Sequence, residues 1–328
     1  MTNAALEEHP VRLGVIGAGV WGANVIRTCA RLGALAAVCD SNLQRLGEMR
    51  ERYPRVEGFA SAETMLARAD LDGLVVASPA QAHASLALMA ISAGMDVLVE
   101  KPLALNVLDA QRVVRAARQH DRKLMVGHVL LYHPGIRCML QAIEDGEIGE
   151  VRFVRCRRLN WGRLRAHENV WWSFAPHDVA LILEVMGAEP LSASCAAGSY
   201  VTPSIADVVY AHYSFPEGRA AHVEVSWLNP ERVSAIEVFG TSGVLTFNDG
   251  RAGSSLTLTP CGSRESEAGA ALWRDEPQAI VVPEGEPLAL ELQSFCRAIR
   301  GDETPLTDGE EGLAVVRALA MLQGTEGS

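Results

Sequence analysis

The sequence predicts an α/β chain of two domains: a doubly wound parallel sheet in residues 1–128, and an α+β domain with a large, mostly antiparallel sheet in residues 129–328. Two observations lead to this prediction. Up to Val126, short apolar runs alternate with helical patterns, and such β–α repeats build parallel sheets. After Val126, strand-like runs follow one another through turns such as Pro216-Glu217-Gly218, which favours antiparallel hairpins.

Turn and capping residues bound the expected elements of the first domain. Asn106 precedes a helical pattern with Asp109 three residues on, the spacing of a helix N-cap, and Gly33 and Gly94 stand where helices end. We expect strands at Val11–Ile16, Leu35–Cys39, Gly73–Ala77, Val97–Val99 and Lys123–Val126, and helices at Ala23–Leu32, Ala62–Arg68, Gln81–Ala93 and 106–119.

The second domain should be dominated by strands. Its broad sheet needs a cover on its second face, so we expect a homodimer or homotetramer formed through this sheet. The most loop-like stretch is 261–278. Strands are expected at Val151–Leu159, Leu191–Gly198, Asp207–Phe215, Ala220–Leu228, Arg232–Phe239 and Val244–Phe247, and helices at Pro134–Glu144, Leu288–Arg300 and Gly309–Leu322.

Composition excludes several classes of protein. A net charge of −11 argues against a general binder of nucleic acid or of anionic membranes. The seven cysteines contain no C-x-x-C pair, so we expect neither a metal site nor disulfides, which suits a reducing cytoplasm. The first ten residues carry no apolar run typical of a secretory signal, and no stretch approaches the length of a membrane span.

A glycine motif follows the first expected strand. Gly17, Gly19 and Gly22 form G-x-G-x-x-G with Val20 and Trp21 between them, and a helix follows. These glycines permit a tight turn, close approach of a pyrophosphate and close helix packing, which is the dinucleotide-binding pattern of a Rossmann domain. Asp40 ends the next strand, where its carboxylate would accept bonds from the adenosine ribose and repel a 2′-phosphate. NAD is therefore favoured, while Ser41 and Arg45 leave NADP open.

The carboxyl ends of later strands gather further candidates, because ligands of open parallel sheets bind at this edge. Val97–Val99 ends on Glu100 and Lys101, and Lys101 is a candidate proton-transfer residue beside the nicotinamide. The alternative is a solvated ion pair at a turn. Cofactor contacts are expected from this pair and from Ser78, Pro79 and His83, although His83 could equally lie on a helix surface.

Arginines and tryptophans cluster early in the second domain. The window Arg152–Arg165 contains six arginines and no acid. Arg155 and Arg157 would share one face of a strand and Arg158 would take the other. Such arginines could bind an anionic substrate, with Trp161, Trp171 and Trp172 as stacking surface, or they could form an exposed face with salt bridges. The six are Arg152, Arg155, Arg157, Arg158, Arg163 and Arg165.

His177 and Asp178 precede an almost wholly apolar run, which predicts a buried helix starting near His177. A histidine near a helix terminus is a credible general base or acid, and Asp178 could cap the helix. A satisfied structural histidine is the alternative.

The glycine motif, the Glu100-Lys101-Pro102 triplet, the histidine of the second domain and the ending ELQSFCRAIRG…PLTDGEEGLAVVRAL together resemble the glucose–fructose oxidoreductase / inositol dehydrogenase / rhizopine catabolism (Gfo/Idh/MocA) family. The resemblance covers essentially the whole chain. It implies a nicotinamide-dependent sugar or polyol oxidoreductase in which Lys101 and His177 flank the reacting carbon. Many members carry D-x-x-x-H, whereas Ser173 stands four residues before His177 here. We therefore expect His177 to act with Lys101, helped by Asp178.

Within this family, the segment from Arg158 to Asp178 looks like the branch that acts on nucleotide-linked sugars. It implies oxidation of the 3-hydroxyl of a UDP-N-acetylhexosamine (UDP-GlcNAc to the 3-keto sugar) for 2,3-diamino-sugar and lipid A pathways. The alternatives are an inositol or dTDP-sugar dehydrogenase, a keto-sugar reductase, and a non-catalytic NAD-binding regulator. Substrate contacts would come from Lys101, His128, Tyr132, Arg158, Asn160, Trp161, Arg165, Trp172, His177 and Asp178.

Overall fold

The structure is a computed structural model that describes residues 10–162, 164–165, 168–250, 253–266 and 269–323. Its chain divides into two compact units, which are described separately below. The first unit takes in the chain up to Gly127 together with Leu288–Leu313. The second takes in His128–Pro287 and the chain from Ala314 onward.

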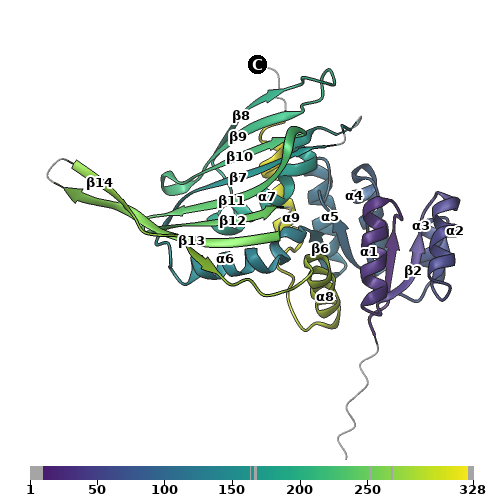
Figure 1. Cartoon of the computed structure of the whole chain (residues 1–328). Helices are drawn as coiled ribbons and strands as arrows, with labels where there is room; N and C mark the ends of the chain where they lie inside the picture. Colours follow the sequence, from purple (N-terminus) through teal and green to yellow (C-terminus); the bar gives the residue numbers. More distant parts are fainter. Residues whose placement is uncertain (1–9, 163, 166–167, 251–252, 267–268, 324–328) are drawn as a thin grey trace, which may run out of the picture. The chain divides into compact units, whose positions relative to one another are not determined.

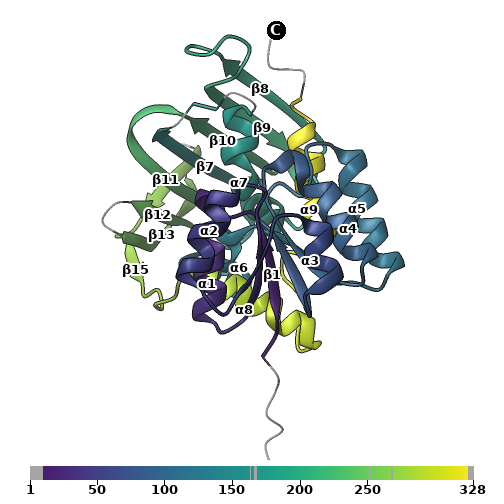
Figure 2. The ribbon, with the colours of Figure 1, turned by 90° about the vertical axis from the view of Figure 1, so that its right-hand side faces the viewer.

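The first unit is built on a parallel sheet with the order β3-β2-β1-β4-β5-β6 among the described residues. Its strands are β1 (Leu13–Ile16), β2 (Leu35–Cys39), β3 (Glu57–Phe59), β4 (Gly73–Val76), β5 (Asp96–Glu100) and β6 (Leu124–Gly127). Every residue of the central strands β1, β4 and β5 is buried, as expected for a sheet covered on both faces. Figure 2 shows α1 and α2 on one side of β1 and α3 to α5 on the other. These helices are α1 (Val20–Arg31), α2 (Leu43–Arg52), α3 (Ala62–Arg68), α4 (His83–Ser92) and α5 (Val107–Gln119), with a 3₁₀ turn η1 (Ala80–Ala82) before α4.

The predicted caps of the first unit are confirmed. Asn106 Oδ1 accepts the backbone N–H of Asp109 at 2.9 Å, and α5 begins at the next residue, Val107. Gly33 (φ +72°) and Gly94 (φ +83°) follow the last turns of α1 and α4 in the left-handed conformation that glycine adopts at low cost. The sequence interpretation missed α2 and β3. Leu46 is the buried residue of α2, so the helix has too little apolar periodicity to stand out.

The first unit is completed by a segment from the far end of the chain. The backbone N–H of Val126 in β6 donates to Thr307 O at 2.8 Å, and Met125 forms a β-bridge with Asp308. This segment lies between the helices α8 (Pro287–Arg300) and α9 (Gly309–Ala320). The expected contiguous domains, 1–128 and 129–328, therefore differ from the observed units in the placement of Leu288–Leu313.

The second unit is built on a larger sheet with the order β14-β13-β12-β11-β7-β10-β9-β8 in the part of the chain described, and β15 pairs with β13. Its neighbouring strands are antiparallel apart from β7 and β10, which confirms the predicted fold class. The strands are β7 (Val151–Trp161), β8 (Ser192–Gly198), β9 (Val208–Ser214), β10 (Ala220–Ser226), β11 (Leu228–Gly240), β12 (Gly243–Gly250), β13 (Gly253–Ser266), β14 (Gly269–Arg274) and β15 (Gln278–Ile280).

Helix α7 (Val170–Met186) is the buried helix of the second unit. Trp171, at 1% exposure, donates from its indole Nε1 to Leu319 O, and the Tyr213 hydroxyl of β9 donates to Ala318 O. Two backbone carbonyls near the end of α9 therefore accept hydrogen bonds, one from a side chain of α7 and one from a side chain of the sheet. These bonds satisfy the buried indole, the buried hydroxyl and both carbonyls. The remaining helices of the unit are α6 (Pro134–Glu144) and the 3₁₀ turns η2 (Val129–Tyr132) and η3 (Pro216–Gly218).

The prediction of a loop at 261–278 is wrong. β13 and β14 pair antiparallel from Cys261↔Arg274 to Ser266↔Gly269, and the hairpin extends outward from the sheet in Figure 1. Its strands are rich in glycine, serine and charged residues, and the described side chains of β14 are largely exposed. Hydrogen bonding between the two strands forms this hairpin without the apolar alternation from which strands are predicted.

Two sequence expectations concern the chain as a whole. All seven cysteines lie in the described residues, and none of them forms a disulfide. Burial, followed by the charges of Asp40 and Glu63, raises the pKa of Cys39 to about 11, so this thiol stays protonated at neutral pH. Across the described ranges, no helix combines the length and apolar character that a bilayer crossing requires.

Two helical glycines give a matched test of packing. Gly312 of α9 lies directly against Val126 Cγ2, so a methyl group at this position would collide with β6, whereas Gly47 of α2 has no neighbouring atom within 4 Å. We expect Gly312→Ala to lower the free energy of unfolding by about 1–3 kcal/mol. Gly47→Ala should raise it by about 0.5–1 kcal/mol through helix propensity. Denaturant unfolding of both variants measures this difference, and equal midpoints would contradict the described packing of α9 on β6.

Candidate functional site

The glycine loop between β1 and α1 has a backbone that other residues could not adopt. Gly17 has φ +102°, and a Cβ there would lie 2.5 Å from Ala77 O. A Cβ on Gly22 would collide with Gly17 O, whereas Gly19 faces nothing closer than Arg45 at 3.9 Å. No side chain among the described residues caps α1 at Gly19, so its first N–H groups are available to an anion. This loop fits the pyrophosphate of a dinucleotide.

Asp40 is buried at the carboxyl end of β2 and is held by backbone groups. Its Oδ2 accepts the N–H of Ala18 at 2.7 Å, and its Oδ1 accepts the N–H of Asn42 at 2.8 Å. Both bonds fix the carboxylate beside the glycine loop, where it is suited to accept bonds from ribose hydroxyls. The guanidinium of Arg45 lies 4.0 Å from Oδ2 and is half exposed.

Glu100 joins the end of β5 to the glycine loop. The indole Nε1 of Trp21 donates to Glu100 Oε1, and Glu100 Oε2 lies over Gly127, where a Cβ would approach it to 2.9 Å. Val20 and Trp21 are exposed at the start of α1. Lys101 follows Glu100 directly, so its backbone starts from this anchored strand end at the carboxyl edge of the parallel sheet.

Ser78, Pro79 and His83 follow β4 at the same edge. His83 is 1% exposed, with Nδ1 2.7 Å from Pro102 O and Nε2 2.9 Å from Ser78 O. Its ring is therefore engaged by backbone carbonyls rather than lying on a helix surface. A contact between His83 and the cofactor remains a prediction.

Glu291 of α8 is a candidate that the sequence interpretation missed. Its carboxyl is fully buried, and neither oxygen has a hydrogen-bond partner among the described residues. Burial, followed by the charge of Glu100, raises the pKa of Glu291 well above its usual value, because both disfavour the ionised carboxylate. Helical spacing could have revealed it, because Glu291 occupies the same buried face as Leu288, Leu292 and Phe295.

In the second unit, α7 begins earlier than predicted. Asn169 is its N-cap, with Oδ1 accepting the N–H of Trp172 at 3.1 Å, and Pro176 lies inside the helix. The expectations that the helix starts near His177 and that Asp178 caps it are both wrong. The apolar residues before Pro176 bury the added turns, and this burial outweighs the helix-breaking effect of the proline.

Arg158 and Asp178 bind each other. Arg158 Nε donates to Asp178 Oδ2 at 2.9 Å and Nη2 donates to Oδ1 at 2.7 Å, which is a bidentate pair. Burial lowers the pKa of Arg158, but the charge of Asp178 and its hydrogen bonds raise that pKa by more, so it lies above the ordinary value. Both carboxylate oxygens of Asp178 are thus engaged by Arg158, and the expected help of Asp178 to His177 has no support in this geometry.

His177 lies next to other candidates of the second unit. The rings of His177 and His128 are 6.5 Å apart between centroids and nearly perpendicular. Ser173 is one helical turn before His177, on the same face of α7, and both Ser173 and His128 are buried. Tyr132 ends the turn η2 that follows His128 and is 8% exposed. Among the candidates of this unit the structure thus brings His128 and His177 together, and their contact with a substrate stays a prediction.

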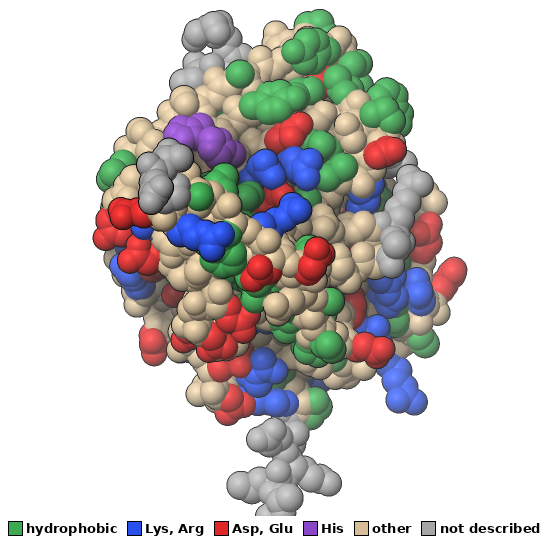
Figure 3. Space-filling model, turned by 60° about the vertical axis from the view of Figure 1, so that its left-hand side comes forward, with side chains coloured by type: hydrophobic (Ala, Val, Ile, Leu, Met, Phe, Trp, Pro, Cys, Tyr) green, Lys and Arg blue, Asp and Glu red, His purple; other side chains and the backbone are tan. Residues whose placement is uncertain are grey.

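The arginine window is mostly neutralised by carboxylates. Arg155 and Arg158 occupy opposite faces of β7 as predicted, and each pairs with an acid, Glu237 and Asp178. Figure 3 also shows Lys and Arg side chains next to Asp and Glu rather than in one continuous basic patch. The pairing of these arginines with carboxylates favours the interpretation that the window forms an exposed face with salt bridges. The other described pairs are Arg152–Glu150 and Arg165–Glu168, while Arg163 lies outside the described residues.

The three tryptophans of this region differ in how far they are exposed to solvent. Trp172 is buried in the first turn of α7, and Trp171 is bonded to Leu319 as described above. Trp161, at the end of β7, is 67% exposed, and Asn160 precedes it at intermediate exposure. Trp161 is therefore accessible, and its stacking on a substrate stays a prediction, whereas Trp171 is part of the core.

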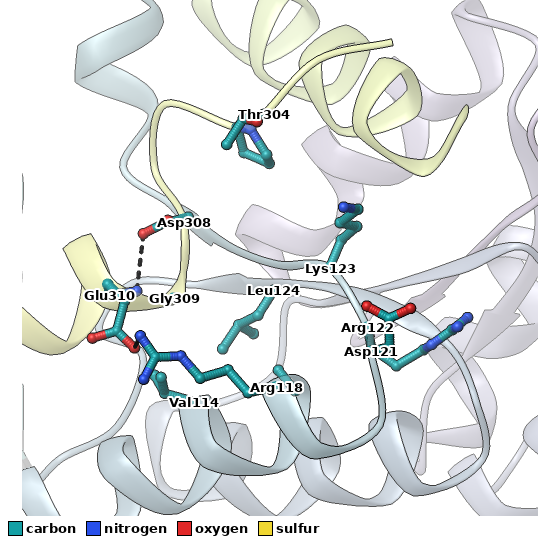
Figure 4. A pocket seen from close by; sticks show the side chains of 12 residues that line it. Val114, Arg118, Asp121, Arg122, Lys123, Leu124, Thr304, Asp308, Gly309 and Glu310 are labelled. Atoms are coloured by element: carbon teal, nitrogen blue, oxygen red, sulfur yellow. Dashed lines mark hydrogen bonds and ion pairs between the residues drawn. The ribbon is translucent and has the colours of Figure 1, made fainter. Parts of the chain in front are cut away.

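A separate cavity of about 360 Å³ opens at the opposite, amino-terminal edge of the parallel sheet. Two of its charged groups pair with each other, because Arg118 binds Glu310 at 2.7 Å, and Asp308 accepts the backbone N–H of Glu310 at 2.9 Å (Figure 4). Because dinucleotides bind outside the carboxyl ends of parallel strands, this cavity is not the candidate cofactor site.

Two family domains match this chain in succession. Residues 11–128 match the oxidoreductase family with an NAD-binding Rossmann fold, and residues 136–246 match the GFO/IDH/MocA C-terminal domain. Together they span more than half of the chain. The chain belongs to the Gfo/Idh/MocA oxidoreductase family. As a member of this family it is an NAD-dependent enzyme acting on a CH–OH group, as the sequence predicted.

Relatives within the Gfo/Idh/MocA family include dehydrogenases of two substrate types. A UDP-N-acetylglucosamine 3-dehydrogenase of Acidithiobacillus ferrooxidans is 27% identical over 94% of this chain and 95% of its own length. An inositol 2-dehydrogenase of Paenarthrobacter aurescens is 28% identical over 96% of both chains. A solved structure of UDP-N-acetylglucosamine 3-dehydrogenase from Acidithiobacillus ferrooxidans has a TM-score of 0.85 and 25% identity, covering 97% of this chain and 98% of the other.

The Arg158–Asp178 pair can be tested by a thermodynamic cycle. Arg158→Ala should leave the Asp178 carboxylate buried and unpaired, lowering the free energy of unfolding by about 3–5 kcal/mol. The double variant Arg158→Met/Asp178→Leu should recover most of this loss, because it removes both charges. Arg165→Ala, at an exposed pair, is the control and should cost less than about 1 kcal/mol. Equal effects of Arg158→Ala and Arg165→Ala on chemical denaturation would contradict a buried pair.

Proposed function

We propose that this protein is a cytoplasmic NAD-dependent dehydrogenase that oxidises the 3-hydroxyl of a UDP-N-acetylhexosamine, UDP-GlcNAc to the 3-keto sugar, for 2,3-diamino-sugar and lipid A synthesis. The observation that carries the proposal is similarity along nearly the whole chain, in sequence and in fold, to a UDP-N-acetylglucosamine 3-dehydrogenase. The exposed indole of Trp161 supports it as a surface for stacking a base. Seven cysteines that form no disulfide support a reducing compartment such as the cytoplasm.

In this mechanism two residues act on the substrate hydroxyl. NAD, when bound, supplies the hydride acceptor. His177 accepts the proton of the hydroxyl, and the ammonium of Lys101 stabilises the developing alkoxide; the reverse assignment, with Lys101 as proton acceptor, is the alternative. Ser173 carries no carboxylate, so His177 acts without the aspartate of the D-x-x-x-H pattern. Asp40 binds the ribose, and the glycine loop binds the pyrophosphate.

The second candidate is an inositol or other neutral polyol dehydrogenase. It is supported by the relative from Paenarthrobacter aurescens and by the pairing of four window arginines with carboxylates. Arginines that are already neutralised contribute less to binding a pyrophosphate than free ones. A regulator without catalytic activity is the third candidate.

Substrate choice can be measured through NADH formation. The purified protein is offered UDP-GlcNAc, UDP-GalNAc, dTDP-glucose and myo-inositol with NAD and, separately, with NADP. We expect the highest kcat/KM with a UDP-N-acetylhexosamine and NAD, because Asp40 repels the 2′-phosphate of NADP. Turnover of myo-inositol with inert nucleotide sugars would establish the second candidate instead.

Variants then separate catalysis from cofactor binding in the same assay. Lys101→Ala and His177→Asn should each lower kcat by about 10²–10⁴-fold, the usual contribution of a positioned acid or base. The dissociation constant for NAD should stay near the wild-type value. Near-normal turnover by both variants would disprove this mechanism. Binding of NAD with no turnover of any sugar by the wild type would favour the regulator.

We further propose that the enzyme assembles as a homodimer or homotetramer through the face of the larger sheet opposite α7. On this face Phe153 and Phe239 stack with centroids 4.0 Å apart, next to Arg155 and His222. Both rings are partly exposed, and apolar rings on the open face of a broad sheet favour coverage by a second copy.

Assembly through this face can be tested by placing a charge in it. Phe239→Glu should shift the protein toward the monomer, because it buries an unpaired carboxylate in the proposed contact. Leu108→Glu, on the exposed surface of α5, is the control and should leave the mass unchanged. Sedimentation measures the mass of each variant, and a wild-type protein that is monomeric at micromolar concentration would contradict the proposal.

A further inference from the structure

The hydrogen bonds of His83 raise a question of proton count. Both ring nitrogens lie within hydrogen-bond distance of backbone carbonyl oxygens, at 2.7 Å from Pro102 O and 2.9 Å from Ser78 O. Carbonyl oxygens accept hydrogen bonds and cannot donate them. A neutral imidazole has one N–H and one lone pair, so it satisfies one of these contacts and places a lone pair against the other oxygen.

Solvent gives the second contact no alternative solution. His83 is 1% exposed, so water does not separate the ring from either oxygen. A buried nitrogen lone pair facing a carbonyl oxygen loses its hydrogen bond and adds repulsion between two acceptors. An imidazolium ring donates from both nitrogens and satisfies both oxygens with charge-assisted bonds.

Charged residues near α4 have to be compatible with a buried cation. Strand β4 and turn η1 carry no charged side chain. Strand β5 carries Glu100 at the carboxyl edge, two residues before Pro102, with Lys101 between them, and Asp96 at the other end. The buried Glu100 favours the cation, whereas the ammonium of Lys101 opposes it. Two further helices contact α4, and the charged residues of both are Glu63 and Arg68 in α3, and Asp109, Arg112, Arg115 and Arg118 in α5. Within α5, Asp109 forms an ion pair with Arg112, and Arg118 forms one with Glu310.

The two carbonyls belong to the connections that leave adjacent strands β4 and β5. Ser78 follows β4, and Pro102 follows the Lys101 of the proposed mechanism. We propose that His83 is an imidazolium at neutral pH that clamps these two connections together, and that it is thereby a positioning residue for Lys101. Its role in turnover rests on the proposed function, whereas its protonation state does not.

The protonation state can be observed directly by ¹⁵N NMR of the histidine-labelled full chain. His83→Gln identifies the His83 signals among those of the nine histidines. An unperturbed histidine is mostly neutral at a pH of about 7.5. We expect both ring nitrogens of His83 to be protonated at this pH and to lose a proton at higher pH, with loosening of the clamp. A ring nitrogen with the signature of an unprotonated lone pair at this pH would overturn the proposal, whatever sugar the enzyme oxidises.

Amide replacements distinguish the two arms of the clamp. The Asn amide nitrogen takes the approximate place of Nδ1 and restores the bond to Pro102, whereas the Gln amide nitrogen takes that of Nε2 and restores the bond to Ser78. We expect His83→Gln to lower kcat by about tenfold or more, the equivalent of one lost hydrogen bond. His83→Asn should lose less, because it keeps the arm next to Lys101, and the dissociation constant for NAD should change little in either variant.

A purely structural role gives a different pattern. If His83 only stabilises the fold, the Asn and Gln variants should lose kcat in proportion to their loss of thermal stability, with no preference for the Pro102 arm. Such a result would overturn the positioning role. His120→Gln, at the exposed end of α5, is the matched control and should change neither kcat nor the melting temperature.

Discussion

Polar groups buried at the carboxyl edge of the parallel sheet have to bond within the protein, because water does not reach them. Asp40 bonds the glycine loop, Glu100 bonds Trp21 of that same loop, and His83 bonds the connections after β4 and β5. The side chains proposed to contact a ligand are thus attached to a backbone that these bonds already fix. Such preorganisation lowers the cost of ordering on binding.

The second unit meets the same constraint with a different solution. Asp178 is fully buried within an apolar helix, and Arg158 from β7 reaches it with two hydrogen bonds. This pair connects helix to sheet and fixes one side of α7, the helix that carries His177. An ion pair in this position is weak evidence for stability, since apolar residues could fill the same space, but it defines how the helix is rotated on the sheet.

The sequence was most informative where the chemistry is local. The glycine motif, the strand end at Asp40 and the caps at Asn106 and Gly33 depend on residues a few positions apart, and their places in the fold were predicted. Partners far apart in the chain could not be predicted in this way. Nothing in the neighbourhood of Asp178 identifies Arg158 as its partner, and nothing near Glu100 identifies Glu291. The start of α7 was misplaced because a proline and a histidine were given more weight than the apolar residues before them.

The return of Leu288–Leu313 to the first unit has a consequence for how the protein is made. Strand β6 is synthesised well before Thr307, whose carbonyl accepts the N–H of Val126 in that strand. Domains usually fold as they emerge, amino-terminal part first. Here the first unit lacks the segment that flanks β6 while His128–Pro287 of the second unit is translated. A nascent chain paused before residue 288 would therefore present an unfinished dinucleotide-binding sheet to chaperones.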